Sequence, residues 1–274
     1  MSGNEGFKNI SNSCFAIVAV QMIFSNVDLM NFIQDPKTTN LLKKGKGHLL
    51  RELQRLMRST STKEEDLKNL LKIVAKGKYN DGRQHDAPEF YDALIDTLRE
   101  DIKKEDQDVF DVIVLSLIEE NRTCIECGKQ DTKYIKVYSH RIPVKTATFV
   151  ENFKLHFKTI QQDRRCSSRS CDSKKCELES NIVRSPQMLV VCFNRFEVKD
   201  GKEGTSKISK AISTPLLFNV NQTEFFLRCS VIHRGRLIEI NFTMLHFIVM
   251  HFSVFYVNVL HVTVLNLTVQ NVLV

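Results

Sequence analysis

The chain has 274 residues, 42% of them hydrophobic, and a formal net charge of +7. This length suits one large domain or two small ones, and the apolar content is ample for a core. The charge is modest, indicates an ordinary basic surface and does not by itself identify a partner. Residues 1–12 are polar and the apolar run after them lacks a basic flank and a cleavage site, so we expect no secretory signal peptide. We therefore expect an intracellular protein of the cytoplasm or nucleus, with eight cysteines that serve as thiols and metal ligands before disulfides.

Residues 1–105 are predicted to be mostly helical, with a first helix from Cys14 to Phe24. Ser61 and Glu64 form a capping box for a second helix, which Gly77 can end. The apolar face of this helix contains Leu67, Leu70, Leu71 and Val74. Asp86 and Glu89 form another capping box, with Pro88 near the helix start. The apolar stripe of this third helix contains Phe90, Ala93, Leu94 and Leu98, and we expect both faces to pack in the core.

The character of the chain changes towards strands between residues 110 and 200. The segments 134–138 and 188–196 are rich in β-branched and aromatic residues, which favours strands. A charged, cysteine-rich stretch from Asp163 to Cys176 lies between them. The polar, glycine-containing segment from Lys199 to Lys210 is predicted to be a surface loop.

The C-terminal segment differs in kind, because no Asp, Glu, Lys or Arg occurs from Ile240 to Val274. It can be a run of buried strands, or a membrane span from Leu245 to Val264. It can also be a stretch foreign to the domain, read past a splice junction. We favour this third interpretation, because natural domains keep charge on their surface. The membrane span is disfavoured, because its three histidines and one asparagine would be costly in lipid.

Cys14 is the first candidate for catalysis, because it begins an apolar run after a polar loop. A thiol in the first turn of a helix feels the positive end of the helix dipole, which favours the nucleophilic thiolate and a lowered pKa. N–H groups of the preceding loop can cradle an oxyanion.

Four segments, in order, resemble the ubiquitin-specific proteases. Residues 6–21 are similar to the family's cysteine box, and residues 84–90 to its Gln-Gln-Asp-Ala-His-Glu-Phe motif. Residues 185–196 resemble its Leu-Pro-x-x-Leu to Arg-Phe strand, and residues 226–235 the strand before its catalytic histidine. The positions that match within the cysteine box are Gly6, Asn9, Asn12, Cys14 and Gln21.

The resemblance covers residues 4–235 and implies an α+β, papain-like cysteine protease. It implies a helical thumb over residues 1–105, zinc-tied β fingers and the start of the palm over 106–200, and the rest of an incomplete palm sheet over 201–235. Residues 236–274 then form an anomalous tail beyond a domain that is truncated at its C-terminal side.

The resemblance also assigns roles. Cys14 is the nucleophile and Asn9 the oxyanion donor, and the reaction is hydrolysis of amide or isopeptide bonds after the C-terminal glycine of ubiquitin. Asp86 and Gln84 are assigned to substrate binding: Asp86 accepts backbone N–H groups of the extended ubiquitin tail, and Gln84 shapes the helix start beside it. The implied partners are ubiquitin and ubiquitinated proteins, and we expect a monomer.

The general base is missing from the pattern. The family shows Gly-His-Tyr soon after the strand that ends near His233, and this chain has no Gly-His-Tyr. His246, in Leu-His-Phe, is the nearest substitute, although it lies late and lacks the glycine. We therefore expect an impaired deubiquitinase. The alternatives are a non-catalytic ubiquitin-binding pseudo-protease and an unrelated thiol hydrolase, and the ordered motifs argue against the latter.

Cys124 and Cys127 form a C-x-x-C knuckle, which can supply two thiolates to one ion. The other two ligands must come from Cys166, Cys171 and Cys176, and the resemblance supports Cys166 and Cys171. The predicted cofactor is a structural zinc ion. The alternative is a decayed ligand set of free thiols. The five basic residues between 164 and 175 have no aromatic residue among them, so we expect no nucleic-acid binding.

Overall fold

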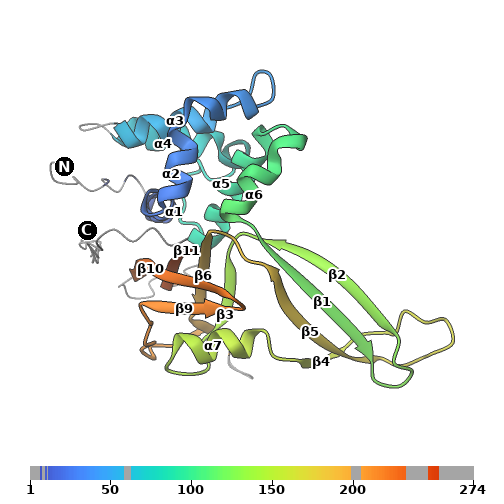
Figure 1. Ribbon diagram of the computed structural model, residues 1–274. Helices are drawn as coiled ribbons and strands as arrows, with labels where there is room; N and C mark the ends of the chain where they lie inside the picture. The colour runs from blue at the N-terminus through green and yellow to red at the C-terminus, as the bar shows by residue number, and fades with distance from the viewer. Residues whose placement is uncertain are drawn as a thin grey trace.

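The computed structural model describes residues 7, 10, 12–58, 63–198, 205–232 and 246–252. The N-terminal part is a lobe of packed helices (the helical lobe), shown at the top of Figure 1. Its elements are α1 (Cys14–Ser25), α2 (Val27–Gln34), η1 (Pro36–Leu41), α3 (His48–Arg58), α4 (Lys63–Ile73), η2 (Val74–Gly77), α5 (Ala87–Asp101), η3 (Lys104–Asp106) and α6 (Gln107–Val114).

The start of α5 follows its sequence signals. Asp86 is the N-cap, and its Oδ1 accepts a hydrogen bond from the backbone N–H of Glu89 at 2.8 Å. Proline stands in the first turn, where its missing N–H costs nothing. The predicted stripe faces inward, and the Phe90 ring meets the Phe15 ring of α1 edge to face at 5.1 Å. This contact sets the start of α5 against the start of α1.

The predicted apolar face of α4 is also confirmed, because Leu67, Leu70 and Val74 are fully buried. Gly77 ends the segment in the left-handed region, with φ of +83°, where a side chain would be strained. The predicted cap at Ser61 lies outside the described residues.

An antiparallel sheet in the order β2-β1-β5-β4 (the outer sheet) extends away from the helical lobe in Figure 1. Its strands are β1 (Ser116–Cys124), β2 (Gln130–Val137), β4 (Ile160–Asp163) and β5 (Lys175–Arg184). The segment predicted as a strand at 134–138 is the second half of β2. The long register between β1 and β5 runs out to the pair Cys124 and Cys176.

A second sheet, in the order β3-β6-β11-β10-β9 (the central sheet), lies below the helical lobe. Its strands are β3 (His140–Pro143), β6 (Met188–Asn194), β9 (Leu217–Val220), β10 (Thr223–Ile232) and β11 (His246–Phe252), with α7 (Phe149–His156) beside it. The predicted loop over 199–210 is partly wrong, because β8 (Thr205–Lys207) pairs with β7 (Phe196–Val198). Pairing with a neighbouring strand satisfies the backbone groups of this polar segment.

The central sheet is covered on both faces. Met188, Val190 and Cys192 of β6 belong to the core under the helical lobe. Their neighbours Leu189, Val191 and Phe193 belong to a second core. This second core includes Phe149 and Phe153 of α7, as the two-residue period of a strand requires. The sheet is therefore the middle layer between α1 and α7.

Part of the apolar tail belongs to this sheet. Residues 246–252 form β11, which lies between β6 and β10. Of the three interpretations, the one that predicts strands therefore applies to residues 246–252, and it contradicts a helical span from Leu245 to Val264. Residues 253–274 lie outside the described residues. Within the described ranges no single helix is long and apolar enough to cross a membrane, although α1 and α2 together reach that length with a 91° bend.

Candidate active site and metal centre

Cys14 is half-buried at the first position of α1, directly after a tight turn. The backbone N–H of Ile10 donates to Oγ of Ser13 at 2.9 Å, and the N–H of Ser13 donates to the carbonyl of Ile10 at 3.1 Å. These reciprocal bonds close the turn and use the Ser13 hydroxyl there, so Ser13 makes no side-chain cap on α1. The turn therefore sets where the thiol begins the helix.

Asn12 ties this turn to the loop before α5. Its φ of +64° lies in the left-handed region, which asparagine tolerates better than most residues. Its side-chain amide donates to the carbonyl of Gly82 at 3.2 Å, and its Oδ1 accepts from Nε2 of Gln84 at 3.3 Å. Gln84, which the resemblance places beside the substrate, thus contacts the turn of residues 10–13 that precedes Cys14 (the nucleophile turn, after the role proposed for Cys14).

The environment of the Cys14 thiol differs from the sequence expectation. Burial raises the pKa of Cys14, and the backbone N–H groups of Phe15 and Cys14 oppose this only in part. The expected lowering by the helix N-terminus is therefore outweighed by desolvation. As a result, Cys14 needs a proton acceptor before it can attack.

Of the other residues predicted for the active site, the structure describes Asp86 and His246. Asn9 and His233 fall outside the described residues. Asp86 is half-buried as the N-cap of α5, with one carboxylate oxygen engaged by Glu89. His246 begins β11, and the register sets it opposite Ile232 at the end of β10.

A histidine–carboxylate pair, not predicted from the sequence, lies in the loop before α5. Nε2 of His85 lies 2.8 Å from Oδ1 of Asp81, and the His85 ring packs edge-on to Phe15 at 5.2 Å. The hydrogen bond from His85 lowers the pKa of Asp81. The sequence signal that could have revealed this pair is the spacing of four residues between Asp81 and His85. This pair braces the loop that also supplies Gly82 and Gln84.

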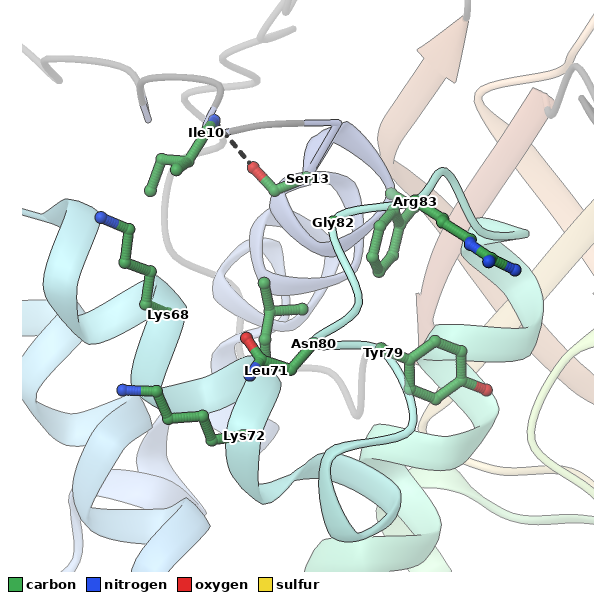
Figure 2. Close-up of a pocket in the computed structure, with 10 residues that line it drawn as sticks. Ile10, Ser13, Lys68, Leu71, Lys72, Tyr79, Asn80, Gly82 and Arg83 are labelled. Carbon is green, nitrogen blue, oxygen red and sulfur yellow. Dashed lines mark hydrogen bonds between the residues drawn. The ribbon is translucent and has the colours of Figure 1, made fainter.

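A cavity of about 180 Å³ lies beside the nucleophile turn. Figure 2 shows Ser13 pointing to Ile10 above it, and Lys68 and Lys72 of α4 on one side. The cavity also touches Phe15, Leu71, Tyr79, Asn80, Gly82 and Arg83. It borders both neighbours of Cys14, whereas Cys14 itself is not part of its lining.

Four cysteines meet at the far end of the outer sheet. Sγ of Cys124 lies 3.8 Å from that of Cys171, and Sγ of Cys127 lies 3.6 Å from that of Cys166. All four sulfurs lie within 4.8 Å of one another. A tetrahedral zinc ion with Zn–S bonds of about 2.3 Å requires S···S distances of about 3.8 Å. The arrangement therefore fits a Cys₄ zinc site.

Local structure explains why these four residues meet. Gly128, with φ of +70°, allows the turn after the knuckle. The other two ligands stand in the loop between β4 and β5. Cys176 is buried within β5, opposite Cys124, and does not belong to the group. Backbone N–H groups of Cys127 and Glu126 lower the pKa of Cys124 to about 6, which favours the thiolate that a metal binds.

A family model described as ubiquitin carboxyl-terminal hydrolase matches residues 5–236. The chain belongs to the ubiquitin carboxyl-terminal hydrolase family. By family it is a thiol protease and a deubiquitinase, and the resemblance stated from the four motifs is confirmed. A comparison with curated proteins finds no significant match.

Solved structures of this family's fold are similar to the chain. One is a SAGA DUB module of Ubp8, Sgf11, Sus1 and Sgf73 bound to monoubiquitin, with a TM-score of 0.72 and 15% identity. A second holds the same module bound to ubiquitin aldehyde, with a TM-score of 0.71 and 15% identity. Both comparisons cover 90% of this chain and 69% of the other. A yeast SAGA DUB module with a mutant Sgf73 gives a TM-score of 0.70 at 14% identity, with 90% and 68% covered. The predicted α+β, papain-like fold class is confirmed.

Proposed function

We propose that this chain is a thiol-dependent deubiquitinase that cleaves amide and isopeptide bonds after the C-terminal glycine of ubiquitin, and that its catalysis is impaired. The observation that carries the proposal is the position of Cys14, at the start of α1 in a turn pinned to the loop before α5. Family membership and the ubiquitin-bound state of two similar structures support ubiquitin as the partner. Eight free cysteines support a reducing, intracellular setting.

In the proposed reaction the Cys14 thiolate attacks the carbonyl carbon of the terminal glycine and forms a tetrahedral oxyanion. Asn9 is proposed to donate to that oxygen, a contribution on the order of 3 kcal/mol at comparable sites. Collapse breaks the C–N bond, the amine leaves with a proton, and a thioester remains on Cys14. Water then hydrolyses the thioester to the free ubiquitin carboxylate. Asp86 has a carboxylate oxygen free of its cap bond, which can accept backbone N–H groups of the ubiquitin tail.

Two observations about proton transfer support the proposed impairment. The pKa of Cys14 is raised by burial, so little thiolate forms without a base. The chain contains no Gly-His-Tyr motif. His246 is the residue we propose in the role of base, because it begins the strand next to the end of β10. An unaided thiol at this position would acylate slowly and protonate the leaving amine poorly.

We propose that the Cys₄ site holds a structural zinc ion. When bound, zinc would supply strong bonds to four thiolates and no step in the hydrolysis. Those bonds would join the end of β1 to the loop between β4 and β5. The outer sheet would thereby keep its far end closed.

The second candidate function is a non-catalytic ubiquitin-binding module. The raised pKa of Cys14 and the absent motif favour it over an active enzyme. It predicts ubiquitin binding with no turnover, whereas an impaired enzyme retains a measurable rate.

A ubiquitin with a C-terminal electrophile separates these functions. We expect an adduct on Cys14, located by mass spectrometry and lost in Cys14→Ala, together with slow cleavage of a fluorogenic ubiquitin amide. Binding of ubiquitin to the chain without any adduct would select the pseudo-protease, and no binding at all would exclude both. His246→Ala should lower turnover further, whereas the matched control His48→Ala, at an exposed site on α3, should not.

A further inference from the structure

Asp92 joins α5 to the central sheet. Its Oδ1 accepts a hydrogen bond from Oγ of Ser139 at 2.7 Å, and its Oδ2 accepts from Nη2 of Arg141 at 3.2 Å. Ser139 is 5% exposed, so the carboxylate satisfies a buried hydroxyl directly before β3. Arg141 lies within β3 itself. One side chain of the helical lobe thus holds two residues at the edge of the sheet.

Two neighbouring contacts repeat the connection. The hydroxyl of Tyr138 donates to Oδ1 of Asp96, one turn further along α5, at 3.2 Å. The hydroxyl of Tyr91 lies 4.0 Å from the sulfur of Met188 in β6. Side chains of α5 therefore form hydrogen bonds with the residues directly before β3, and Tyr91 of α5 also contacts β6.

The register of the central sheet connects the residues held by Asp92 to the proposed catalytic residues. Arg141 of β3 pairs with Cys192 of β6, and Cys192 pairs with Phe247 of β11. Phe247 follows His246, so the row held by Asp92 reaches the start of β11. At its other end, α5 begins three residues after Gln84, which contacts the turn before Cys14. Asp92 therefore stands between the nucleophile side and the sheet side of the site.

We propose that Asp92 is a positioning residue, whose carboxylate clamps Ser139 and Arg141 and thereby holds the central sheet in register with the turn that carries Cys14. This inference rests on the proposed function, because the alignment matters only where a ubiquitin tail lies between α1 and the sheet.

The clamp responds to pH. Burial raises the pKa of Asp92 to about 6, while the Ser139 hydroxyl and the Arg141 guanidinium oppose that shift and Asp86 adds to it. Tyr91 and Cys192 also face this carboxylate, and burial raises the pKa of each well above its usual value, so both stay neutral. Arg141 pairs with the ionised form only, so the clamp weakens as pH falls through about 6.

The test compares two reagents on the same thiol. A ubiquitin electrophile reacts only when α1 and the sheet are aligned around the tail, whereas iodoacetamide requires only an accessible Cys14. We expect Asp92→Ala to slow the ubiquitin electrophile about tenfold or more while leaving the iodoacetamide rate within about twofold, since small misplacements cost large factors. The control is Glu100→Ala, at an exposed site of the same helix, with both rates unchanged.

Asp92→Asn adds a second readout, because its amide oxygen still accepts from Ser139 but carries no charge. The ratio of wild-type to Asp92→Asn rates with the ubiquitin electrophile should rise between pH 5 and 7, with a midpoint near 6. Equal losses with both reagents, or a ratio that does not change with pH, would overturn the positioning role in favour of a general loss of structure.

Failure of the proposed function is recognised separately, because the wild-type chain would then not react with the ubiquitin electrophile at all. In that case hydrogen exchange of the backbone amides of residues 140–142 decides whether the clamp exists. Faster exchange in Asp92→Ala than in Glu100→Ala supports it, and equal exchange overturns it.

Discussion

The side-chain amide of Gln84 donates a hydrogen bond to Oδ1 of Asn12, 72 residues away in sequence and two residues before Cys14. A residue that the resemblance associates with substrate therefore also supports the nucleophile turn. The donor and acceptor are both at the surface, so the bond restricts geometry more than it adds stability.

Asn12→Ala should destabilise the protein by about 1 to 2 kcal/mol, because alanine pays for a positive φ and both side-chain bonds are lost. Asn12→Gly keeps the left-handed conformation at little cost and should lose less. Urea unfolding of the two variants measures the difference. Equal destabilisation would show that the backbone conformation at this turn carries no strain.

The Cys₄ site predicts retention of zinc by the purified chain. Cys127→Ser and Cys166→Ser should each lose the metal and lower the unfolding temperature, because three thiolates and a hydroxyl bind zinc far more weakly. Cys176→Ala should keep it, since Cys176 lies outside the group. Metal content by atomic emission checks all three, and zinc lost equally from Cys176→Ala would contradict the assignment.

Stability should fall as the solution becomes acidic, through His140. This ring lies within hydrogen-bond distance of the Ser116 hydroxyl at 2.8 Å, and burial lowers the pKa of His140 to about 3. The pKa of His140 in the folded chain lies below its value in the unfolded chain. As the pH falls, His140 therefore binds a proton in the unfolded chain before it does so in the folded one. The contribution of neutral His140 is complete above the unfolded pKa and is lost progressively below it, amounting to about 2 kcal/mol between pH 7.5 and 5.

Other groups modulate that slope. Burial lowers the pKa of His156 as well, which acts in the same direction. Asp92 acts oppositely, because its folded pKa is raised to about 6 and its protonated form is favoured in the folded state. Urea midpoints of the wild type and His140→Gln, compared at pH 7.5 and pH 5, isolate the histidine. A difference between them that does not change with pH would exclude this role.

Arg99 and Asp111 form the most buried ion pair of the helical lobe among the described residues. Nη2 of Arg99 donates to Oδ2 of Asp111 at 2.9 Å, and the Asp111 side chain is 1% exposed. Arg99→Met should cost about 3 to 5 kcal/mol, because it leaves a buried carboxylate whose remaining ion partner is Lys136 at 3.7 Å.

The double variant Arg99→Met with Asp111→Leu tests that reason. It removes both charges and should recover more than half of the loss, because the buried carboxylate is gone. Denaturant unfolding of the single and double variants measures the loss of stability in Arg99→Met and the part of it that the double variant recovers. Additive losses would show that packing, and not the unpaired charge, dominates.

Local signals were sufficient for the apolar faces of α4 and α5 and for the start of α5. The Asp86 cap and the buried stripes of α4 and α5 follow from spacing alone, because capping and amphipathic faces depend on residues three or four positions apart. The C-x-x-C knuckle is local in the same sense, because one tight turn holds both thiols.

The place of residues 246–252 in the central sheet could not be predicted from such local signals. Residues 246–252 lack charge and look foreign to the domain, yet their backbone pairs with β6 on one side and with β10 on the other. A strand in the middle of a sheet is defined by its neighbours, and those neighbours lie up to 63 residues earlier in the register with β6.

By itself, the amino-acid sequence determined the family, the start of the helix that begins at Cys14, the apolar faces of α4 and α5 and the C-x-x-C half of the candidate metal centre. These are short-range properties of the chain. Only the tertiary structure decided that burial raises the pKa of Cys14 and that Gln84 braces Asn12, and only it brings Cys166 and Cys171, which the resemblance favours over Cys176, to the two cysteines of the knuckle. Desolvation and contacts between distant segments exist only once the chain has folded, so no local pattern encodes them.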